Sequence, residues 1–306
     1  MIDFDTGLVI SILASTLRRT VPLLLAATGG AFSMRSGVID LGLEGMMLAG
    51  SFFSVMGAWM TGSPWIGLLF GVVFGIVFSM LHAVMHINYK VNGSISGMAV
   101  NLLAAAMTPL LLTIVYGLSG KSEIVTSFSN FDPDWLMGIP FLGPILGSQN
   151  VIFFIAMALV IISWIFMFKT TLGLRMRMVG ENPHAASAVG LNVKAYKYFG
   201  VAMSGALAGL GGAYLSLGQM GMFVKDMTAG RGYIAVVINA FGRYNPFGAL
   251  AGSAFFGFFD ALQTIFQSVF PSQLVMMTPY VVTILVIVFG LKGGRSPAGT
   301  GKHVEE

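Results

Sequence analysis

Residues 150–169 read NVIFFIAMALVIISWIFMFK, and Lys169 is the one charged side chain in this stretch. An α-helix needs about 20 apolar residues to cross a bilayer core of about 30 Å. The whole chain of 306 residues has a similar character, being 56% hydrophobic and 9% charged, against about 25% charged in a soluble domain. The sequence therefore predicts an integral membrane protein and excludes soluble enzymes, disordered chains and coiled coils.

Apolar stretches of membrane-spanning length recur along the chain and predict an all-α fold, a polytopic bundle of about 8–10 transmembrane helices including half-helices. We expect one transmembrane domain over residues 1–306, with no signal peptide before it. The first expected span contains Arg18 and Arg19, and the seventh is short enough to be a half-helix. The expected spans lie near 8–33, 38–60, 65–87, 95–117, 150–169, 198–217, 227–242, 247–268 and 274–290.

The positions of the basic residues predict how the chain is oriented, because Lys and Arg accumulate in cytoplasmic loops. If residues 172–198 are cytoplasmic, most of the 16 Lys and Arg side chains lie on that side. The N-terminus is then expected outside and the C-terminus in the cytoplasm. Residues 118–149, which contain several carboxylates but one lysine, become an external loop.

The basic stretch 172–198 contains a short helix with clear boundary signals. Asn182 is a good N-cap, Pro183 suits the first helical position, and Gly190 can end the helix in a left-handed conformation. These signals predict about two turns over His184–Val189, too short to be stable alone. Composition alone does not decide whether this helix is a docking element for another protein or an ordinary interfacial loop helix.

Small residues spaced four apart predict close helix packing, because glycine lets backbones approach where lipid removes the hydrophobic driving force. Dimerisation is the alternative use of such spacing. The glycines expected to pack in this way are Gly71, Gly75, Gly205, Gly209, Gly248 and Gly252.

Polar side chains inside apolar spans are costly and usually face a partner or water. Asn101, Asn239, Asp260 and Gln263 are the clearest cases. Asp260 suits either a structural partner or a ligand. Asp40 and Glu44 share one helix face and predict an interfacial salt bridge or a helix-cap network near the cytoplasmic end of span two.

Motifs for catalysis or metal binding are weak. The chain has no cysteine, and Gly120-Lys121-Ser122 supplies only the end of an ATP-binding loop. His82 and His86 have the spacing of a helical zinc pair but lack the glutamate of a metalloprotease, so we expect interfacial histidines. We therefore expect no catalytic residue, metal site or cofactor of this chain's own.

Three segments resemble the permease subunits of bacterial ABC importers in the branched-chain amino acid, ribose and nucleoside superfamily. They are SMRSGVIDLGLEGMMLAGSF (33–52), GENPHAASAVGLNVKAYKYFGVAMSGALAGLGGAYLSLG (180–218) and IAVVINAFGRYNPFGALAGSAFFGFF (234–259). The resemblance covers nearly the whole chain in order and implies a type II-like importer fold in the bacterial cytoplasmic membrane.

The resemblance further implies that residues 183–189 are a coupling helix seated in a separate ATP-binding subunit, which binds and hydrolyses the ATP. The partners it implies are that subunit, a second permease that is identical or related, an extracytoplasmic substrate-binding protein or lipoprotein, and membrane lipid, but no nucleic acid. The residues it assigns to coupling are Gly180, Glu181, Asn182, Pro183, Ala185, Ala186 and Gly190.

Within the superfamily, the motif GVIDLGLEGMM most resembles the nucleoside permeases. A simple sugar such as ribose or galactose is the alternative substrate, and another heteroaromatic solute such as a flavin is a further one. A stand-alone channel or secondary transporter is the alternative from a different class. Because a nucleoside path needs aromatic surfaces and amides, the candidate path residues are Phe52, Phe53, Asn101, Asn239 and Gln263.

Overall fold

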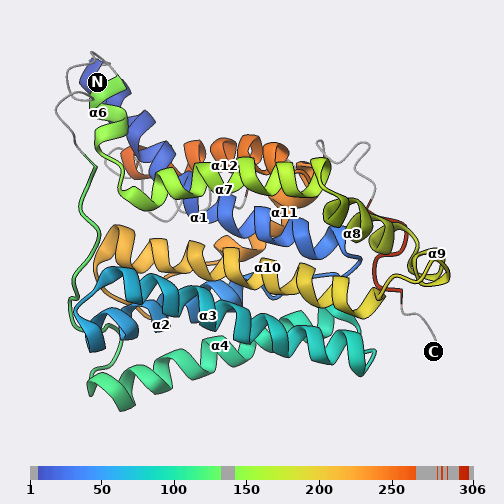
Figure 1. Ribbon diagram of the computed structural model, residues 1–306. Coiled ribbons are helices and arrows are strands. Elements are labelled where there is room, and N and C mark those ends of the chain that lie inside the picture. Colours follow the sequence, from blue (N-terminus) through green and yellow to red (C-terminus); the bar gives the residue numbers. More distant parts are fainter. Residues whose placement is uncertain are drawn as a thin grey trace.

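The computed structural model describes residues 6–131, 142–266 and 296–302, together with Val281, Ile284 and Val288. Within these residues the chain is a bundle of helices (Figure 1). The helices are α1 (Thr6–Arg35), α2 (Leu43–Thr61), α3 (Pro64–Ala83), α4 (Gly93–Tyr116), α6 (Leu142–Gly147), α7 (Val151–Lys169), α8 (Thr171–Glu181), α9 (Pro183–Ala188), α10 (Val193–Ala213), α11 (Arg231–Phe241) and α12 (Pro246–Phe266). Two π-helical turns, η1 (Val84–Asn88) and η2 (Tyr214–Met220), extend α3 and α10.

Within the described residues, helices occupy the first eight expected spans, and of the ninth, 274–290, only Val281, Ile284 and Val288 are described. Among the described residues, five helices are long and apolar enough to cross a membrane: 7–35, 64–88, 93–116, 151–169 and 193–220. The helix α1 is continuous over 30 residues through Arg18 and Arg19. The expected half-helix is α11, with 11 residues.

One boundary is corrected by the structure. The second span was expected from residue 38, but α2 begins at Leu43, and residues 38–41 have no regular secondary structure. Non-helical backbone is tolerated at membrane depth only where protein or water satisfies its polar groups. Side chains of α1, α3 and α4 supply those partners: Ser33 bonds Val38 O, His82 bonds Ile39 O and Asn101 bonds Leu41 O.

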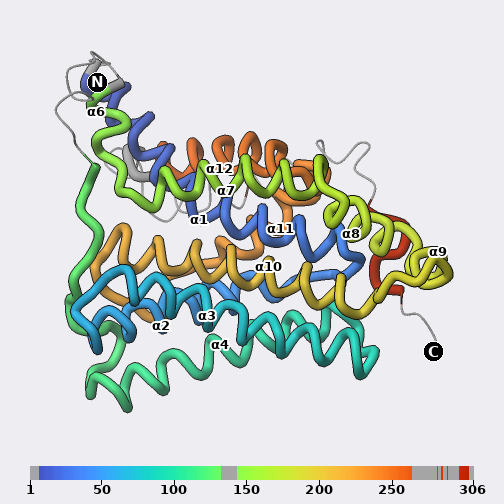
Figure 2. Tube along the Cα trace, viewed as in Figure 1, coloured from blue at the N-terminus to red at the C-terminus, as the bar shows by residue number. Residues whose placement is uncertain are grey.

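The long helices lie side by side, and the two ends of the bundle differ (Figure 1). The start of α1 and α6 lie at one end, and α9 and residues 296–302 lie at the other (Figure 2). The helix α2 packs against α3 and α10, and every residue from Leu43 to Val55 is buried. By contrast, α4 exposes large apolar side chains such as Leu102 and Ile114, as expected for a lipid-facing helix.

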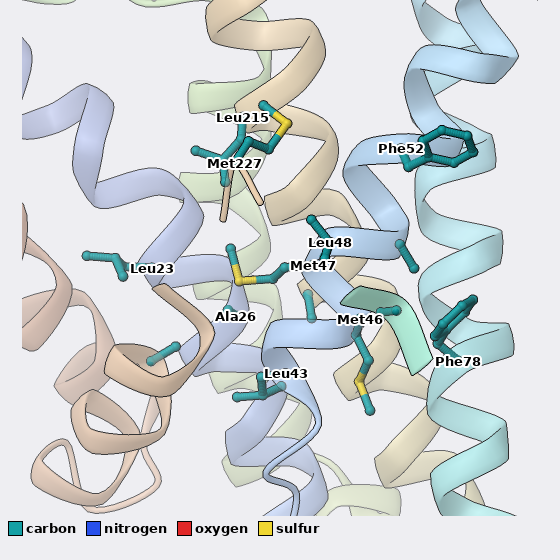
Figure 3. Packing of buried hydrophobic residues seen from close by; sticks show 14 of the residues in the cluster. Leu23, Ala26, Leu43, Met46, Met47, Leu48, Phe52, Phe78, Leu215 and Met227 are labelled. Carbon is teal, nitrogen blue, oxygen red and sulfur yellow. The ribbon is translucent and has the colours of Figure 1, made fainter. Parts of the chain in front are cut away.

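The largest core cluster surrounds α2 (Figure 3). Met46, Met47 and Phe52 are fully buried within it. The flexible methionine side chains fill irregular gaps between helices, while the aromatic ring fixes the spacing of its neighbours. The centre of the bundle is thus a packed interior built around one helix.

Glycines form the closest contacts between α2, α3 and α10. A Cβ atom on Gly209 would overlap the Gly71 carbonyl, and one on Gly75 would overlap the Gly205 carbonyl. Gly212 meets the Met47 carbonyl of α2 in the same way. Further along the chain, Gly248 contacts Gly242, and a Cβ on Gly252 would lie 2.9 Å from Ile238 Cγ2. Except at Gly252, which meets a side chain, these glycines bring backbones into direct contact.

The segment after α4 covers the end of the bundle that carries α6. Ser122 N donates to Phe223 O at 2.9 Å, Val125 N donates to Gly221 O at 2.8 Å, and Phe128 N donates to Leu217 O at 3.1 Å. These bonds join the first part of the expected loop 118–149 to the turn that follows α10.

We expect Gly209→Val to lower the free energy of unfolding by at least about 3 kcal/mol, because its side chain collides with backbone that cannot move aside. Thermal unfolding of the detergent-solubilised protein measures this change. Ala105→Val, at an exposed position of α4, is the matched control and should be neutral. Equal melting temperatures for the two variants would contradict the close-packing assignment.

Candidate functional site: the docking loop and the half-helix

The helix α9 has well-defined caps at both ends. Asn182 Oδ1 accepts a hydrogen bond from Ala185 N at 3.0 Å, and Pro183 occupies the first turn. At the other end Gly190 has a φ of 79°, Gly190 N donates to Ser187 O at 2.9 Å, and Leu191 N donates to Ala186 O at 3.0 Å. This is the Schellman arrangement. The predicted caps are confirmed, and the helix occupies Pro183–Ala188, one residue earlier than expected.

The two faces of α9 differ in exposure. Pro183 and Ala186 are buried against the body of the protein, whereas His184 and Ala185 are exposed. Val189, just after the helix, is 66% exposed. The helix projects beyond the other elements at its end of the bundle (Figure 1). A helix that is capped at both ends and exposes one face of small and polar side chains is suited to contact another protein.

Contacts connect this loop to the half-helix hairpin α11–α12. Gly180 in α8 packs on the Arg35 carbonyl at the end of α1. The Arg35 side chain in turn donates to Tyr244 O at 3.0 Å and to Arg243 O at 2.9 Å, in the turn between α11 and α12. Burial raises the pKa of the Tyr244 hydroxyl, and the nearby Arg35 charge partly opposes this. The end of α1 therefore lies between the docking loop and the hairpin.

Glu44 of α2 caps the N-terminus of the half-helix α11. Its Oε1 accepts from Thr228 Oγ1 at 2.6 Å and from Gly230 N at 2.8 Å, and its Oε2 accepts from Gly232 N at 2.6 Å. Free N–H groups and the helix dipole make a helix N-terminus attractive to anions. Here a carboxylate of the chain itself already fills that position.

Asp40 and Asn101 complete the polar network. Asp40 accepts from Ser204 Oγ at 2.6 Å and from Gly42 N at 3.0 Å. Asn101 accepts from Gly45 N at 2.8 Å and donates to Leu41 O at 2.8 Å and Tyr233 Oη at 3.1 Å. The expectation that Asp40 and Glu44 share one helix face is wrong, because α2 begins at Leu43 and Asp40 precedes it. Both carboxylates instead accept hydrogen bonds from backbone N–H groups, and the helix that Glu44 caps is α11. The alternative salt bridge is not found within the described residues.

Asp260 forms ion pairs with two arginines from other helices. Its Oδ2 lies 2.8 Å from Arg19 Nη1 of α1 and 3.7 Å from Arg231 Nη2 of α11. Asp260 is therefore a structural partner in this structure. Both Asp260 and Arg19 stand out in the sequence, since each places a charge inside an apolar span, but their pairing was not predicted. Arg231, Thr228 and Tyr233 were missed as members of the site.

His82 and His86 are buried and bind non-helical backbone, and the expectation that they lie at the membrane interface stays a prediction. His82 Nε2 donates to Ile39 O at 3.0 Å, and its Nδ1 lies 2.9 Å from Ser96 Oγ. His86 Nδ1 donates to Val91 O at 2.8 Å. Their rings stack with centroids 6.0 Å apart. Both nitrogens of His82 have protein partners, which suits a structural role.

The candidate path residues lie in different parts of the bundle. Phe52 is fully buried, with Phe53 and Phe223 edge-on at 5.2 Å, and it packs the core in this structure. Phe53 stacks on Phe74 at 3.6 Å and is 6% exposed. Asn101 lies beside the start of α11, where it donates to Tyr233 Oη.

The other two candidate path residues lie in α11 and α12. Asn239 is buried near the end of α11, and its Oδ1 atom has no hydrogen-bond partner. Gln263 is half-buried on α12. The structure therefore does not gather the five candidates at one place.

Comparison with known proteins relates the chain to membrane permeases. Residues 12–288 match the family described as branched-chain amino acid transport system / permease component. The nucleoside ABC transporter permease protein NupC of Lactococcus lactis is 38% identical over 302 residues, covering 95% of each chain. The guanosine ABC transporter permease protein NupQ of Bacillus subtilis is 36% identical over 303 residues, again covering 95% of each chain.

A solved structure supports the fold. It is that of PsaBC from Streptococcus pneumoniae in complex with Fab, in which the matching chain is 16% identical, with a TM-score of 0.50 and 94% coverage of each chain. The helical arrangement of the present chain is therefore shared with a known protein.

We expect Glu44→Ala to lower the free energy of unfolding by about 3 kcal/mol or more, because hydrogen bonds to a charged group are worth about 1.5–3 kcal/mol each. Glu44→Gln should also destabilise, since its amide nitrogen would face N–H donors. Asp226→Asn, at an exposed neighbouring position, is the control. If Glu44→Ala and Asp226→Asn melt at the same temperature, Glu44 does not cap α11.

Proposed function

Because the chain belongs to the branched-chain amino acid transport system / permease component family, we propose that it is the permease subunit of an ATP-driven importer that moves nucleosides across a bacterial cytoplasmic membrane. The similarity to two nucleoside permeases over nearly the full length carries the substrate assignment. The transport path runs between this subunit and a second permease, and an extracytoplasmic binding protein or lipoprotein delivers the substrate.

The electrostatics of the half-helix support an uncharged substrate. Half-helix N-termini in transporters commonly receive anionic substrate groups, but Glu44 fills that position in α11. Arg19 and Arg231 are both paired with Asp260. With the buried carboxylate of Asp40, these five formal charges sum to minus one. A neutral nucleoside or sugar suits this interior better than an amino acid, whose carboxylate would compete with Glu44.

The helix α9 is the proposed docking element for the ATP-binding subunit. Ala185 presents a small side chain outward, which lets a partner surface approach the helix closely. Asn182 and Gly190 fix the two ends, while Pro183 and Ala186 anchor the inner face. The ATP-binding subunit binds and hydrolyses ATP, and this subunit contributes motion without chemistry.

Motion of α9 can reach the half-helix through α1. The contacts run from Gly180 to the Arg35 backbone and from the Arg35 side chain to residues 243 and 244. Helices in direct backbone contact move as rigid bodies, which is the usual way that domains close around a ligand. The proposed orientation places α9 in the cytoplasm and the start of α1 outside. Asn239 and Gln263 lie on the hairpin that would move and remain candidates for the path.

Uptake assays test the substrate. Cells that carry the complete importer should accumulate radiolabelled guanosine and adenosine at least tenfold faster than cells that lack this subunit. Ribose, glucose and leucine serve as comparison solutes. Uptake of sugar alone would favour the sugar alternative, and nucleoside uptake that survives ATP depletion would indicate a channel or secondary transporter.

A bulky substitution tests the docking helix. Ala185→Trp should leave membrane insertion intact but reduce both co-purification of the ATP-binding subunit and uptake by about tenfold, because the side chain blocks close approach. Ala105→Trp, on the exposed face of α4, adds the same bulk away from α9. Normal co-purification and uptake by Ala185→Trp would refute docking through α9.

A further inference from the structure

Residues 296–302 lie across the junction between α8 and α9, as the short red segment beside these helices shows (Figures 1 and 2). Gly299 N donates to Gly180 O at 3.0 Å. Ala298 N donates to Glu181 Oε2 at 3.1 Å. Both acceptors belong to the last residues of α8, directly before the N-cap of α9.

The same segment is anchored to two other helices or their ends. Gly301 N donates to Gly37 O at 2.9 Å, just after α1. Lys197 Nζ of α10 donates to Lys302 O at 2.6 Å, and Lys197 is only 3% exposed. A buried ammonium group is costly unless it is hydrogen-bonded, so the Lys302 carbonyl lowers the cost of burying the Lys197 side chain. Residues 296–302 thereby connect α1, α8 and α10.

The fit against α9 is close. A Cβ atom on Gly299 would lie 2.6 Å from Pro183 Cδ and 2.7 Å from Gly180 O. The segment holds its own shape through a turn in which Thr300 N and Thr300 Oγ1 both donate to Pro297 O, at 3.0 and 2.6 Å. Pro297 and Gly299 are buried. The first turn of α9 therefore rests on a preformed turn of the chain.

We propose that residues 296–302 form a positioning strap that fixes the docking helix α9 relative to α1 and α10. This inference rests on the proposed function of α9. A helix of six residues has little stability of its own. Without the strap, a force that the ATP-binding subunit exerts on α9 bends the α8–α9 junction. With the strap in place, the same force displaces α1 and α10 together with α9.

Glu181 has a specific role in holding the strap. Its carboxylate is an acceptor for the Ala298 amide, so Glu181 positions the docking helix through the strap. An uncharged amide oxygen can accept the same hydrogen bond. A direct ionic contact with the ATP-binding subunit, by contrast, requires the negative charge.

Two kinds of substitution test the strap in the complete importer reconstituted in proteoliposomes. In Gly299→Val the added side chain collides with Pro183. The number of ATP molecules hydrolysed per guanosine imported should rise at least fivefold. Lys302→Ala is the matched control, because it removes a side chain but retains the carbonyl that Lys197 needs, and its ratio should match the wild type. Glu181→Ala should also raise the ratio, and Glu181→Gln should restore it to within twofold of the wild type.

The ratio of ATP hydrolysed to guanosine imported distinguishes a positioning strap from a direct ionic contact with the ATP-binding subunit. If Glu181→Gln is as uncoupled as Glu181→Ala, Glu181 acts through its charge and its assigned positioning role is wrong. If Gly299→Val keeps the wild-type ratio, the strap is refuted. If the wild-type importer does not move guanosine, the substrate assignment fails, and the next measurement still tests the strap.

Hydrogen–deuterium exchange on the isolated subunit provides that independent measurement. Gly299→Val should speed amide exchange in residues 183–191 at least tenfold relative to the wild type and Lys302→Ala, while exchange in α4 stays unchanged. Equal exchange in all three proteins would overturn the proposal. Faster exchange throughout the chain would mean general destabilisation and would also count against a local positioning role.

Discussion

The carboxylate of Glu44 on the N-terminus of α11 is the interaction on which the interior of this protein depends. A helix that begins inside a membrane protein exposes N–H groups that lipid cannot satisfy. One side chain of α2 satisfies this end with three hydrogen bonds. Because α2 is itself buried among α3 and α10, the start of the half-helix is fixed to a helix that is held on several sides. The permease can therefore contain a short helix and a hairpin turn without losing its packing.

Backbone contact governs the rest of the architecture. Gly71, Gly75, Gly205 and Gly209 bring α3 and α10 together so closely that little relative sliding is possible without a clash. Non-helical backbone before α2 is held by His82 and Asn101, and Ser204 binds the Asp40 carboxylate of the same segment. The interior of the bundle is thus held by direct contacts between helices. This packing suits a transport subunit in which groups of helices move as bodies.

Much of the fold could be predicted from the sequence, because length and apolar composition define membrane spans, and Asn182, Pro183 and Gly190 are local signals for α9. The half-helix was recognisable because its apolar part is short. Tertiary relationships were not accessible in this way. The pairing of Arg19 with Asp260 joins residues far apart in sequence, the burial of Phe52 depends on its neighbours, and the contact of residues 296–302 with Gly180 has no local signature. Local signals report on a helix and its ends, whereas these contacts depend on how helices are arranged.

The ion pairs of Asp260 have a consequence for the energetics of import. Arg19, Arg231, Asp260 and Glu44 find their partners within this one subunit. Moving one elementary charge across a membrane changes its electrostatic energy by about 2.3 kcal/mol for each 100 mV of membrane potential. If the four side chains keep their partners while an uncharged solute passes, the cycle carries no current. Transmembrane voltage then neither drives nor opposes import, and a cell with a collapsed membrane potential continues to take up the solute as long as it has ATP.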